Sequence, residues 1–482
     1  MSREILINAN PQEKSVAIAD EGRLVEYYIE RPQDKTIVGN IYKGIIETVM
    51  PSINAAFVDI GFPKKGFLYI TDVSEVLEQV DISGTKPRIE LKSGQEVLVQ
   101  VEKEAFGTKG PRLTAHIGLP GRYLVLTGQD TSIGVSRRIE DDDERRRLRQ
   151  ILNEFKASKG EVGFIVRTAA VGRSKQEIER DAHFLLKLWQ RIEKVSKSRK
   201  PPALIYEEYD LTLRTIRDSF TDDVSKVIVN SRQEYIRIIR FVRTFLKHLT
   251  KKVEFYRGDD LFAHKNIESQ VSKIFESKVY LKSKGYIIIE PTEGLVVVDV
   301  NSGGFSKKLS AEDAAFKVNS DAAIEAARQI RLRDLGGIIV IDFIDMQREG
   351  HRREILNILK KELNKDNAKY DIAGISRFGL IELTRERVHR TLATLSFQEC
   401  PYCKGKGRVK SGLTMSIYVL NELRKVLAKS ARKPLINVYL HPSVAEVFTK
   451  DNSSIKFLER QFRIRINVIA NPNLHHEDIS IV

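Results

Sequence analysis

Two apolar runs that each end in an aspartate constrain the fold of this chain more than any other feature. The first, "LVVVDVNSGG", runs into Asp299, and the second, "GGIIVIDFID", runs into Asp342. Near-continuous apolar runs are typical of strands buried in α/β sheets. A helix is expected between them from Ser310 to Arg333, and another from Glu349. The pattern predicts a βαβ-like region with a carboxylate at the end of each strand.

The ends of the first helix carry their own signals. Ser310 and Asp313 form a capping box at its start. Gly336-Gly337 follow its last turn and are expected to end it, because glycine readily adopts the left-handed conformation found there.

Asp299 and Asp342 are candidate metal ligands, because sites in open α/β sheets form at the carboxyl ends of strands. Asn301 faces the same side as Asp299 if the strand continues. With no His or Cys beside them, these oxygen ligands favour Mg²⁺ or Mn²⁺, which could activate a water against a phosphodiester. The alternative is that each aspartate only caps a turn. Asp345 is either a third ligand or a turn residue.

The bulk properties are those of a soluble multidomain protein. The 482 residues are 41% hydrophobic and 30% charged, and they suffice for about three domains. No apolar run approaches the ~18 residues of a membrane span, and the N-terminus has no signal-peptide pattern. A chain with only two cysteines fits a reducing compartment, so a cytoplasmic location is expected.

The net charge of +15 points to a polyanionic partner. Nucleic acid is the expected partner, and a basic surface kept for solubility is the alternative.

Alternating apolar patterns dominate the first 115 residues. A hairpin is predicted at Glu21-Gly22, followed by five short strands that suit a small OB-type barrel for single-stranded RNA. Phe57 and Phe67 lie on predicted barrel strands, and Lys109 lies in the "GTKGPR" loop. Exposed aromatics there would stack on bases and the lysine would meet phosphates, although barrel aromatics are often core residues.

Strands and helices mix after the barrel, up to the basic turn "KSRKPP". Arg167 and Thr168 end the predicted strand "FIVRTAA". An arginine fork beside a hydroxyl suits a terminal phosphate, and a solvated strand end is the alternative interpretation.

Cys400 and Cys403 in "ECPYCKGKG" are the only cysteines. A Cys-x-x-Cys pair in a glycine-rich turn is typical of half a tetrahedral zinc site. A redox couple and two ordinary thiols are the alternatives, and the redox couple is disfavoured because the glycines that follow do not suit a helix start. His389 and the pair His475-His476 could complete a site within one chain, but none has the usual short spacing.

The motifs taken together resemble the ribonuclease E/G family. They are "VGNIYKGIIETVMPSINAAFVDIG", "GTKGPRLT", "SRRIE", "FIVRTAA", "VVVDVNSG", "RLRDLGGIIVIDFIDM", "SRFGLIELTRER" and "CPYCKGKG", in this order. The resemblance covers nearly the whole chain. The long scaffold tail of typical ribonuclease E is missing, so the resemblance is to the ribonuclease G type.

The resemblance implies an α+β multidomain architecture. An RNase H-like domain would be split between residues 1–35 and 211–275, with an S1-type OB barrel at 36–115 inserted. A 5′-sensor region at 116–210, a DNase I-like α/β catalytic domain at 276–397, a zinc-link at 398–408 and a small α+β domain at 409–482 would follow.

The resemblance also assigns roles to residues of this chain. Asp299 and Asp342 match the Mg²⁺-binding aspartates and Asn301 a supporting asparagine, whereas the barrel and sensor positions match RNA contacts. The RNA clamp is Phe57, Phe67 and Lys109; the 5′-phosphate sensor is Arg167 and Thr168, with Val125 and Arg137 as further contacts; and Arg377 falls in the "SRFG" stretch near the active site.

The implied function is a Mg²⁺-dependent, single-strand-specific endoribonuclease that is stimulated by a 5′-monophosphate and acts in rRNA processing and mRNA decay. The family joins two chains through one zinc held by two thiolates from each, which predicts a homodimer, with a tetramer as the alternative. A non-catalytic S1-type RNA-binding or ribosome-assembly protein is a rival, and so is a DNA nuclease or topoisomerase-primase-like enzyme. The aspartate pair argues against the first rival, and the barrel and sensor stretch argue against the second.

Overall fold

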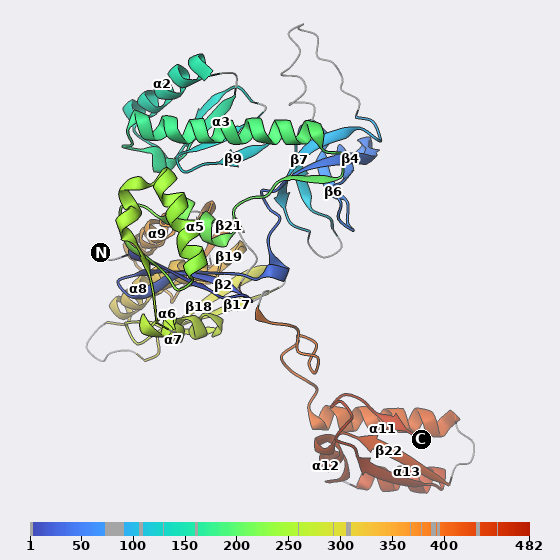
Figure 1. The fold of residues 1–482 in the computed structure, drawn as a ribbon. Coiled ribbons are helices and arrows are strands. Elements are labelled where there is room, and N and C mark those ends of the chain that lie inside the picture. Colours follow the sequence, from blue (N-terminus) through green and yellow to red (C-terminus); the bar gives the residue numbers. More distant parts are fainter. Residues whose placement is uncertain are drawn as a thin grey trace. The chain divides into compact units, whose positions relative to one another are not determined.

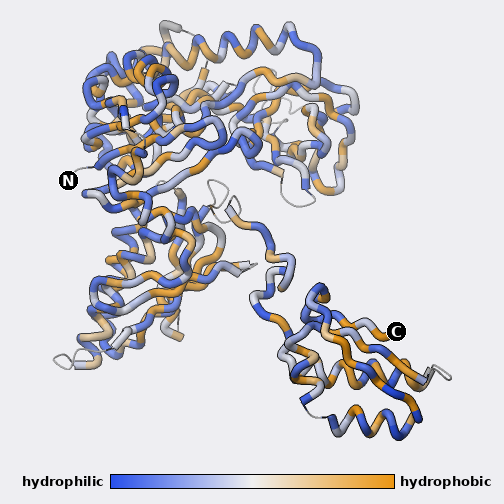
Figure 2. Tube along the Cα trace, turned by 60° about the horizontal axis from the view of Figure 1, so that its bottom comes forward, coloured by the Kyte–Doolittle hydropathy of each residue, from blue (hydrophilic) through white to orange (hydrophobic). Residues whose placement is uncertain are grey.

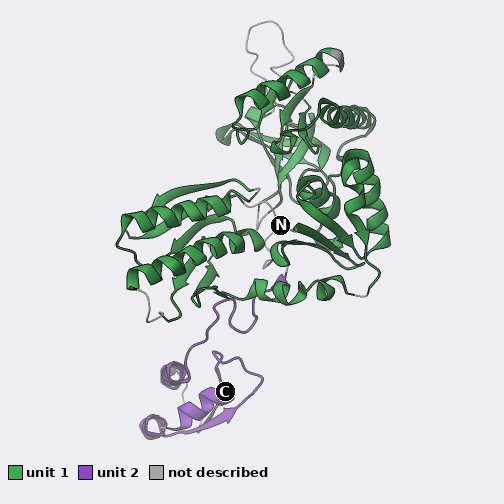
Figure 3. Cartoon of the chain, turned by 90° about the vertical axis from the view of Figure 1, so that its left-hand side faces the viewer, with its two compact units in different colours: residues 1–392 green, residues 393–482 purple. Residues whose placement is uncertain are grey.

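The structure is a computed structural model that describes residues 3–482 except for 73–90, 106–108, 129, 160–161, 259, 293, 305–309, 367, 377, 387–391, 393–395, 430–433 and 451. The chain forms two compact units, residues 1–392 and 393–482, which are coloured separately in Figure 3. Across the described residues, no helix combines the length and the apolar character needed to cross a bilayer.

The two predicted apolar runs are neighbouring strands of a six-stranded sheet with the order β16-β17-β18-β19-β21-β20 (Figure 1). β18 and β19 pair in parallel, and the other neighbours pair antiparallel. Helices α8 (Ala311–Leu332) and α9 (Glu349–Leu363) cover one face and bury their apolar sides against it. The strands are β16 (Lys278–Tyr280), β17 (Tyr286–Pro291), β18 (Leu295–Asn301), β19 (Gly337–Asp342), β20 (Tyr370–Ile375) and β21 (Leu380–Arg385).

Helix α8 begins as the sequence predicts, because the Ser310 hydroxyl caps it by accepting from the Asp313 N–H at 3.1 Å. The helix ends at Leu332 with Arg333 as its C-cap, within one residue of the predicted end. The predicted stop at Gly336-Gly337 is wrong, because the left-handed residue directly after the cap is Asp334, with φ 49°, and Gly337 already begins β19. Asp334 holds this conformation because its buried carboxylate pairs with the Arg385 guanidinium at 2.7 Å.

A second sheet has the order β15-β14-β1-β2-β3. In it the N-terminal strand β1 pairs in parallel with β14, which lies more than 200 residues later in the chain; Ile5, for example, pairs with Val227. The predicted hairpin at Glu21-Gly22 is confirmed, since both residues have positive φ (50° and 77°), as a type I′ turn requires. The strands of this second sheet and the helices that lie between or after them in sequence are β1 (Arg3–Ala9), β2 (Lys14–Asp20), β3 (Arg23–Glu30), α4 (Leu211–Ser219), β14 (Val224–Val229), α5 (Arg232–Phe245), β15 (Val253–Phe255), α6 (Leu261–His264) and α7 (Glu268–Ser272).

A closed barrel of five strands follows the N-terminal hairpin. The barrel runs β4-β5-β6-β8-β7 and closes where β4 pairs with β7. Its core consists of alternate strand residues such as Ala56, Val58 and Leu68. β13 (Ala203–Tyr206) extends the sheet beside β4. The barrel strands are β4 (Ile41–Met50), β5 (Ala55–Asp59), β6 (Gly66–Tyr69), β7 (Glu96–Lys103) and β8 (Arg112–Thr114).

A four-stranded sheet, ordered β11-β12-β10-β9, lies between the barrel and β13 in the sequence. Helices α2 (Asp142–Lys159) and α3 (Lys175–Ser198) bury one of its faces. Hydrophobic and hydrophilic residues alternate along α3 at the helical period (Figure 2), and Ile178, Leu185 and Trp189 are among those that face the sheet. The strands are β9 (Gly118–Pro120), β10 (Leu124–Thr127), β11 (Ile133–Val135) and β12 (Gly163–Val166).

The second unit is a small α+β domain. Its three-stranded sheet has the order β23-β22-β24, with a parallel β22–β23 pair, and its helices pack on that sheet. The elements are α11 (Gly412–Lys429), β22 (Leu435–Leu440), α12 (Pro442–Lys450), α13 (Ser453–Phe462), β23 (Arg465–Ala470) and β24 (Ser480–Ile481). The expected mixture of helices and strands around a closed barrel is confirmed, and the RNase H-like and DNase I-like assignments stay predictions.

Candidate active site

Asp299 and Asp342 lie directly opposite each other on the parallel strands β18 and β19. Register partners on adjacent strands point to the same face, which is the face that α8 and α9 leave uncovered. Asn301 lies on this face as well, and its side-chain amide donates to the Asp299 carboxylate at 2.8 Å. Asp342 is exposed and the other two are half-buried, so solvent and substrate can reach all three.

The electrostatics of this cluster suit a bound cation. Partial desolvation, and then the neighbouring charges of Asp299 and Asp345, raise the pKa of Asp342. Within the described ranges, no cluster of three or more His, Cys, Asp or Glu side chains is arranged to hold a metal ion. Two carboxylates and an amide oxygen nevertheless fit Mg²⁺, which takes one or two protein carboxylates and fills its remaining positions with water or phosphate oxygens.

The segment between Asp342 and Asp345 is fixed by Asn319 of helix α8. The Asn319 amide donates to the Ile344 carbonyl at 2.8 Å, and its oxygen accepts from the Ile344 N–H at 3.1 Å. Asn319 is fully buried. The side chain therefore acts as a strand partner for one residue and holds the backbone between the two aspartates.

Glu312, in the first turn of α8, holds the next part of the same segment. Its carboxylate accepts from the N–H groups of Gln347 and Arg348 at 2.9 and 3.1 Å, and from His351 Nδ1 at 2.9 Å. The hydrogen bond from the Gln347 N–H, together with those of Arg348 and His351, lowers the pKa of Glu312 despite some desolvation. The sequence analysis missed Asn319 and Glu312, because a polar residue on a helix gives no sign of the loop it contacts.

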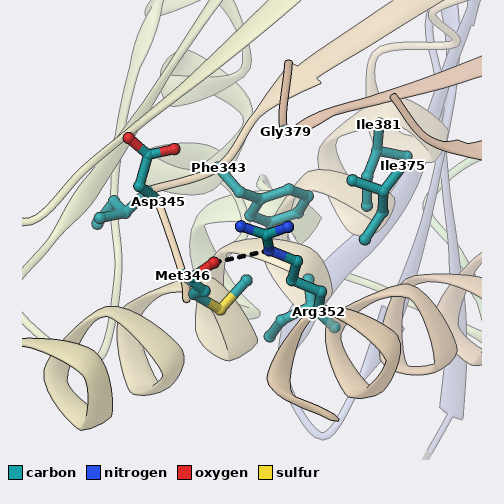
Figure 4. Close-up of a pocket in the computed structure, with 9 residues that line it drawn as sticks. Phe343, Asp345, Met346, Arg352, Ile375, Gly379 and Ile381 are labelled. Atoms are coloured by element: carbon teal, nitrogen blue, oxygen red, sulfur yellow. Dashed lines mark hydrogen bonds between the residues drawn. The ribbon is translucent and has the colours of Figure 1, made fainter. Parts of the chain in front are cut away.

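A narrow cavity of about 20 Å³ lies beneath this segment (Figure 4). Phe343 and Arg352 both line it, and the Arg352 Nε donates to the Met346 carbonyl at 2.6 Å. The Asp345 carboxylate lies to one side, pointing away from Arg352. The Arg352 side chain thus helps to hold the segment after Asp342 in place, and Asp345 stays exposed. Arg377, which the resemblance places near the active site, lies outside the described residues.

Phe57 and Phe67 are on the outer surface of the barrel and not in its core. They are register partners on β5 and β6, half-buried, with ring centroids 6.0 Å apart. Tyr69 extends the row, with its ring 5.0 Å from that of Phe67, and Arg112 lies 5.0 Å from the Tyr69 ring. Strand alternation could have identified Tyr69, because it follows Phe67 by two positions.

Lys109 is exposed and lies just before β8, the parallel neighbour of β6. Gly110 allows the chain to approach the Lys65 carbonyl so closely that a Cβ would clash with it. The Phe67 N–H donates to Pro111 at 2.8 Å, which joins this loop to the aromatic row. The structure therefore places a lysine and the three rings on connected strands.

Arg167 follows β12 and is held in place by two contacts. One terminal nitrogen donates to the Gly121 carbonyl at 2.7 Å, and the other pairs with Asp218 of α4 at 2.7 Å. A guanidinium has five N–H donors, so these contacts leave several for a ligand. Thr168 is exposed beside it.

Val125 lies on β10 and Arg137 lies just after β11, and these are the two strands that flank β12. Val125 pairs with Ile165, which is 44% exposed, so this face of the sheet is open while the other is covered by α2 and α3. Arg137 is exposed just after β11, which runs parallel to β12. The carboxyl ends of both strands meet at one edge, which brings Arg137 to the edge that Arg167 occupies.

Cys400 and Cys403 lie in a tight turn of the second unit and are both free thiols. Backbone N–H groups of Cys403 and Tyr402 lower the pKa of the Cys400 thiol, and the Gly407 N–H donates to the Cys403 sulfur at 3.3 Å. Amides directed at sulfur favour thiolates, the form that binds metal. The pair does not open a helix, since α11 begins only at Gly412.

The histidines that could complete a zinc site have other partners. His475 Nε2 contacts the Tyr402 carbonyl at 2.5 Å, and His476 contacts the Lys410 carbonyl and the Ser443 hydroxyl at 2.8 and 3.1 Å. His389 lies outside the described residues. Among the described residues, His475 and His476 are therefore occupied by backbone and hydroxyl groups near the cysteine turn.

Comparison with known proteins decides the family. The sequence profile described as Ribonuclease E/G family matches residues 118–388, more than half of the chain. The chain belongs to the ribonuclease E/G family. Further matches are an S1 RNA binding domain over residues 35–115 and an "RNase E/G, Thioredoxin-like domain" over residues 399–482.

Relatives within the ribonuclease E/G family are similar to this chain along nearly all of its length. Ribonuclease G of Escherichia coli (strain K12) is 38% identical over 98% of each chain. Ribonuclease G of Haemophilus influenzae is 37% identical over 93% of this chain and 92% of its own. Ribonuclease E of Escherichia coli is 37% identical over 98% of this chain but only 45% of its own length. The resemblance to this family is therefore confirmed.

Proposed function

We propose that the chain is a single-strand-specific endoribonuclease that hydrolyses RNA phosphodiesters with the help of Mg²⁺. The observation that carries the proposal is the direct pairing of Asp299 with Asp342 on the open face of a sheet. Membership of the ribonuclease E/G family and the S1 domain support RNA as the substrate. The relatives named ribonucleases, together with the net charge of +15, point the same way.

In the proposed mechanism Asp299 and Asp342 would hold Mg²⁺, which would lower the pKa of a bound water and neutralise charge on the phosphate. Asn301 fixes the rotamer of Asp299 through its hydrogen bond. Asn319 and Glu312 keep the segment after Asp342 from moving when substrate binds. Hydrolysis forms a bond from the water oxygen to phosphorus and releases the 3′ oxygen, which takes up a proton. The products carry a 5′-phosphate and a 3′-hydroxyl.

The barrel is proposed to grip the single strand. Phe57, Phe67 and Tyr69 form a continuous aromatic surface on which unpaired bases can stack, and Lys109 lies beside it for the phosphates. Duplex RNA offers no unstacked bases to such a surface, which explains the preference for single strands.

The edge of the four-stranded sheet is proposed to sense a 5′-monophosphate. Arg167 is pre-oriented by Gly121 and Asp218, and Thr168 offers a hydroxyl beside it. Arg137 supplies a second positive charge, and Val125 forms the apolar floor. A triphosphate brings more volume and charge than this edge is arranged to meet.

The Cys400–Cys403 turn is proposed to bind half of a Zn²⁺, with the other half supplied by a second copy of the chain. Structural zinc takes four ligands, and the turn offers two. A two-fold axis near the metal supplies the other two, because each chain must offer what its partner offers. The resulting homodimer, or a tetramer built from it, is proposed to act on rRNA precursors and mRNA in the cytoplasm.

Matched single-stranded RNA and DNA oligonucleotides, incubated with Mg²⁺ or EDTA, test the proposal. We expect internal cleavage of the RNA alone, and only with Mg²⁺. RNA binding without cleavage would favour the non-catalytic alternative, and comparable cleavage of DNA would favour the DNA nuclease.

A further inference from the structure

The open face of the sheet that carries the aspartates continues to the edge strand β16. Tyr280 of β16 pairs with Tyr286 of β17, and Tyr286 pairs with Asn301 of β18. Register partners share a face, so these three side chains form one row across the sheet. The residues between them in sequence, Val279 and Ile287, pack in the core on the opposite face.

The neighbouring row reaches the aspartates themselves. Lys278 pairs with Ile288, which pairs with Asp299, which in turn pairs with Asp342. Strands lie about 4.8 Å apart, so β16 is roughly 10 Å from the strand of Asp299. The tyrosines and Lys278 thus lie on the same surface as the proposed metal site, a short distance along it.

The side chains of this edge form an exposed ring, Tyr280, and a half-buried ring, Tyr286, with the cation of Lys278 beside both. These three residues are here called the β16 platform. Tyr280 is 71% exposed, and its ring centroid is 6.4 Å from that of Tyr286. The Lys278 ammonium lies 3.8 Å from the Tyr286 ring and 5.2 Å from the Tyr280 ring. None of the described carboxylates forms an ion pair with Lys278, so its charge is available to an outside anion.

The turn between β16 and β17 adds positive charge and lies close to Asn301 at the end of β18. Lys282 and Lys284 are both exposed in this turn. A Cβ on Gly285 would lie 2.7 Å from the Asn301 carbonyl, so the turn packs closely against the chain that follows the aspartate. The β16–β17 turn and Asn301 are therefore in close backbone contact.

We infer that the β16 platform binds a nucleotide of single-stranded RNA close to the scissile phosphate. A base stacks on Tyr280, and a backbone phosphate lies against Lys278 and the turn lysines. Exposed aromatic rings with cations beside them are the usual elements of single-strand binding surfaces. Continuity with the aspartates and three lysines free to meet phosphates favour RNA over a protein partner. The inference rests on the proposed function and adds to it a contact outside the barrel and the sensor edge.

Binding of a fluorescent single-stranded RNA to the full chain in EDTA, followed by cleavage in Mg²⁺, tests the inference. We expect Tyr280→Ala to weaken binding at least about fivefold and to slow cleavage at limiting RNA by a similar factor. Tyr280→Phe keeps the ring and should stay within about twofold of wild type. Lys278→Gln should reduce the slope of log affinity against log salt by about 0.7, the value for one phosphate of a single strand.

Tyr418→Ala serves as the matched control, because Tyr418 is 45% exposed and has Lys410 4.9 Å from its ring, but lies in the second unit. Thermal melting should show Tyr280→Ala as stable as wild type. The inference is overturned if Tyr280→Ala binds and cleaves like an active wild type, or if Tyr280→Phe or Tyr418→Ala is equally damaging. A wild type that does not cleave RNA would instead refute the proposed function.

Discussion

The side-chain amide of Asn319 forms two hydrogen bonds with the backbone of Ile344, one as donor and one as acceptor. Replacement by alanine leaves a buried N–H and C=O without partners, at about 1–3 kcal/mol each, partly offset where water enters. We expect Asn319→Ala to lower the free energy of unfolding by about 2–4 kcal/mol in urea denaturation. It should also raise the Mg²⁺ concentration needed for half-maximal cleavage, because the backbone between Asp342 and Asp345 loosens.

Ser320→Ala is the control, since Ser320 is the next residue of α8 and its hydroxyl donates to the Phe316 carbonyl of its own helix at 2.7 Å. It should change stability by no more than about 0.5 kcal/mol and leave the Mg²⁺ dependence unchanged. A destabilised Asn319→Ala with wild-type Mg²⁺ dependence would show that the contact stabilises the fold without positioning the loop.

Arg167 should matter only for substrates with a 5′-phosphate. A charge-assisted contact contributes roughly 1.5–3 kcal/mol, so Arg167→Ala should slow cleavage of 5′-monophosphorylated RNA by about tenfold or more. RNA with a 5′-hydroxyl should be cleaved at the wild-type rate. Arg149→Ala, which removes an exposed arginine of α2, should affect neither substrate. Equal slowing of both substrates by Arg167→Ala would indicate a general role in folding or RNA binding.

The two cysteines should bind about half a zinc per chain, because each chain supplies two of four ligands. Strong chelation, or the double substitution Cys400→Ser/Cys403→Ser, should shift the protein toward monomers in analytical ultracentrifugation. Serine keeps the size of the side chain but not the soft thiolate. One zinc per chain by elemental analysis, or a fully dimeric and active double variant, is incompatible with a shared site.

Asp210 should make the fold sensitive to acid. Burial alone raises the pKa of Asp210, but hydrogen bonds from Arg237 and Lys14, both at 2.8 Å, outweigh burial and lower it to about 2. The unfolded value is about 3.9, so the ionised carboxylate contributes about 2 kcal/mol above pH ~5, which is lost as the pH falls toward 2. Urea titrations of wild type and Asp210→Asn should differ at pH 6 and converge near pH 2. A constant difference across this range would show that ionisation of Asp210 is not the cause.

Local sequence signals predicted the parts of the fold that depend on neighbouring residues. The apolar runs before Asp299 and Asp342 correctly predicted two strands, but only alternate residues of each strand are buried, on the face that α8 and α9 cover. The Glu21-Gly22 hairpin and the Ser310 cap were predicted for the same reason, since turns and caps are set within a few residues.

Features that depend on distant parts of the chain could not be predicted from the sequence. Asp334, and not a glycine, ends α8 because Arg385, 51 residues away, pairs with it. The clamp from Asn319 to Ile344 spans 25 residues and has no sequence pattern. The sequence did not show whether Phe57 faces the barrel core or the solvent. In the structure its neighbours Ala56 and Val58 both lie in the core, so Phe57 between them points outward.

The central claim is that Asp299 and Asp342 together hold the metal that supports RNA cleavage. Single-turnover cleavage of a single-stranded RNA across a Mg²⁺ titration, with RNA affinity measured in parallel in EDTA, tests it most directly. Asp299→Asn and Asp342→Asn keep the shape but remove a charged ligand, so each should lose at least ~100-fold in rate with affinity largely kept. Asp371→Asn, at an exposed position of β20 in the same sheet, should cleave like wild type. Near wild-type rates for both Asp299→Asn and Asp342→Asn in limiting Mg²⁺ would contradict the account.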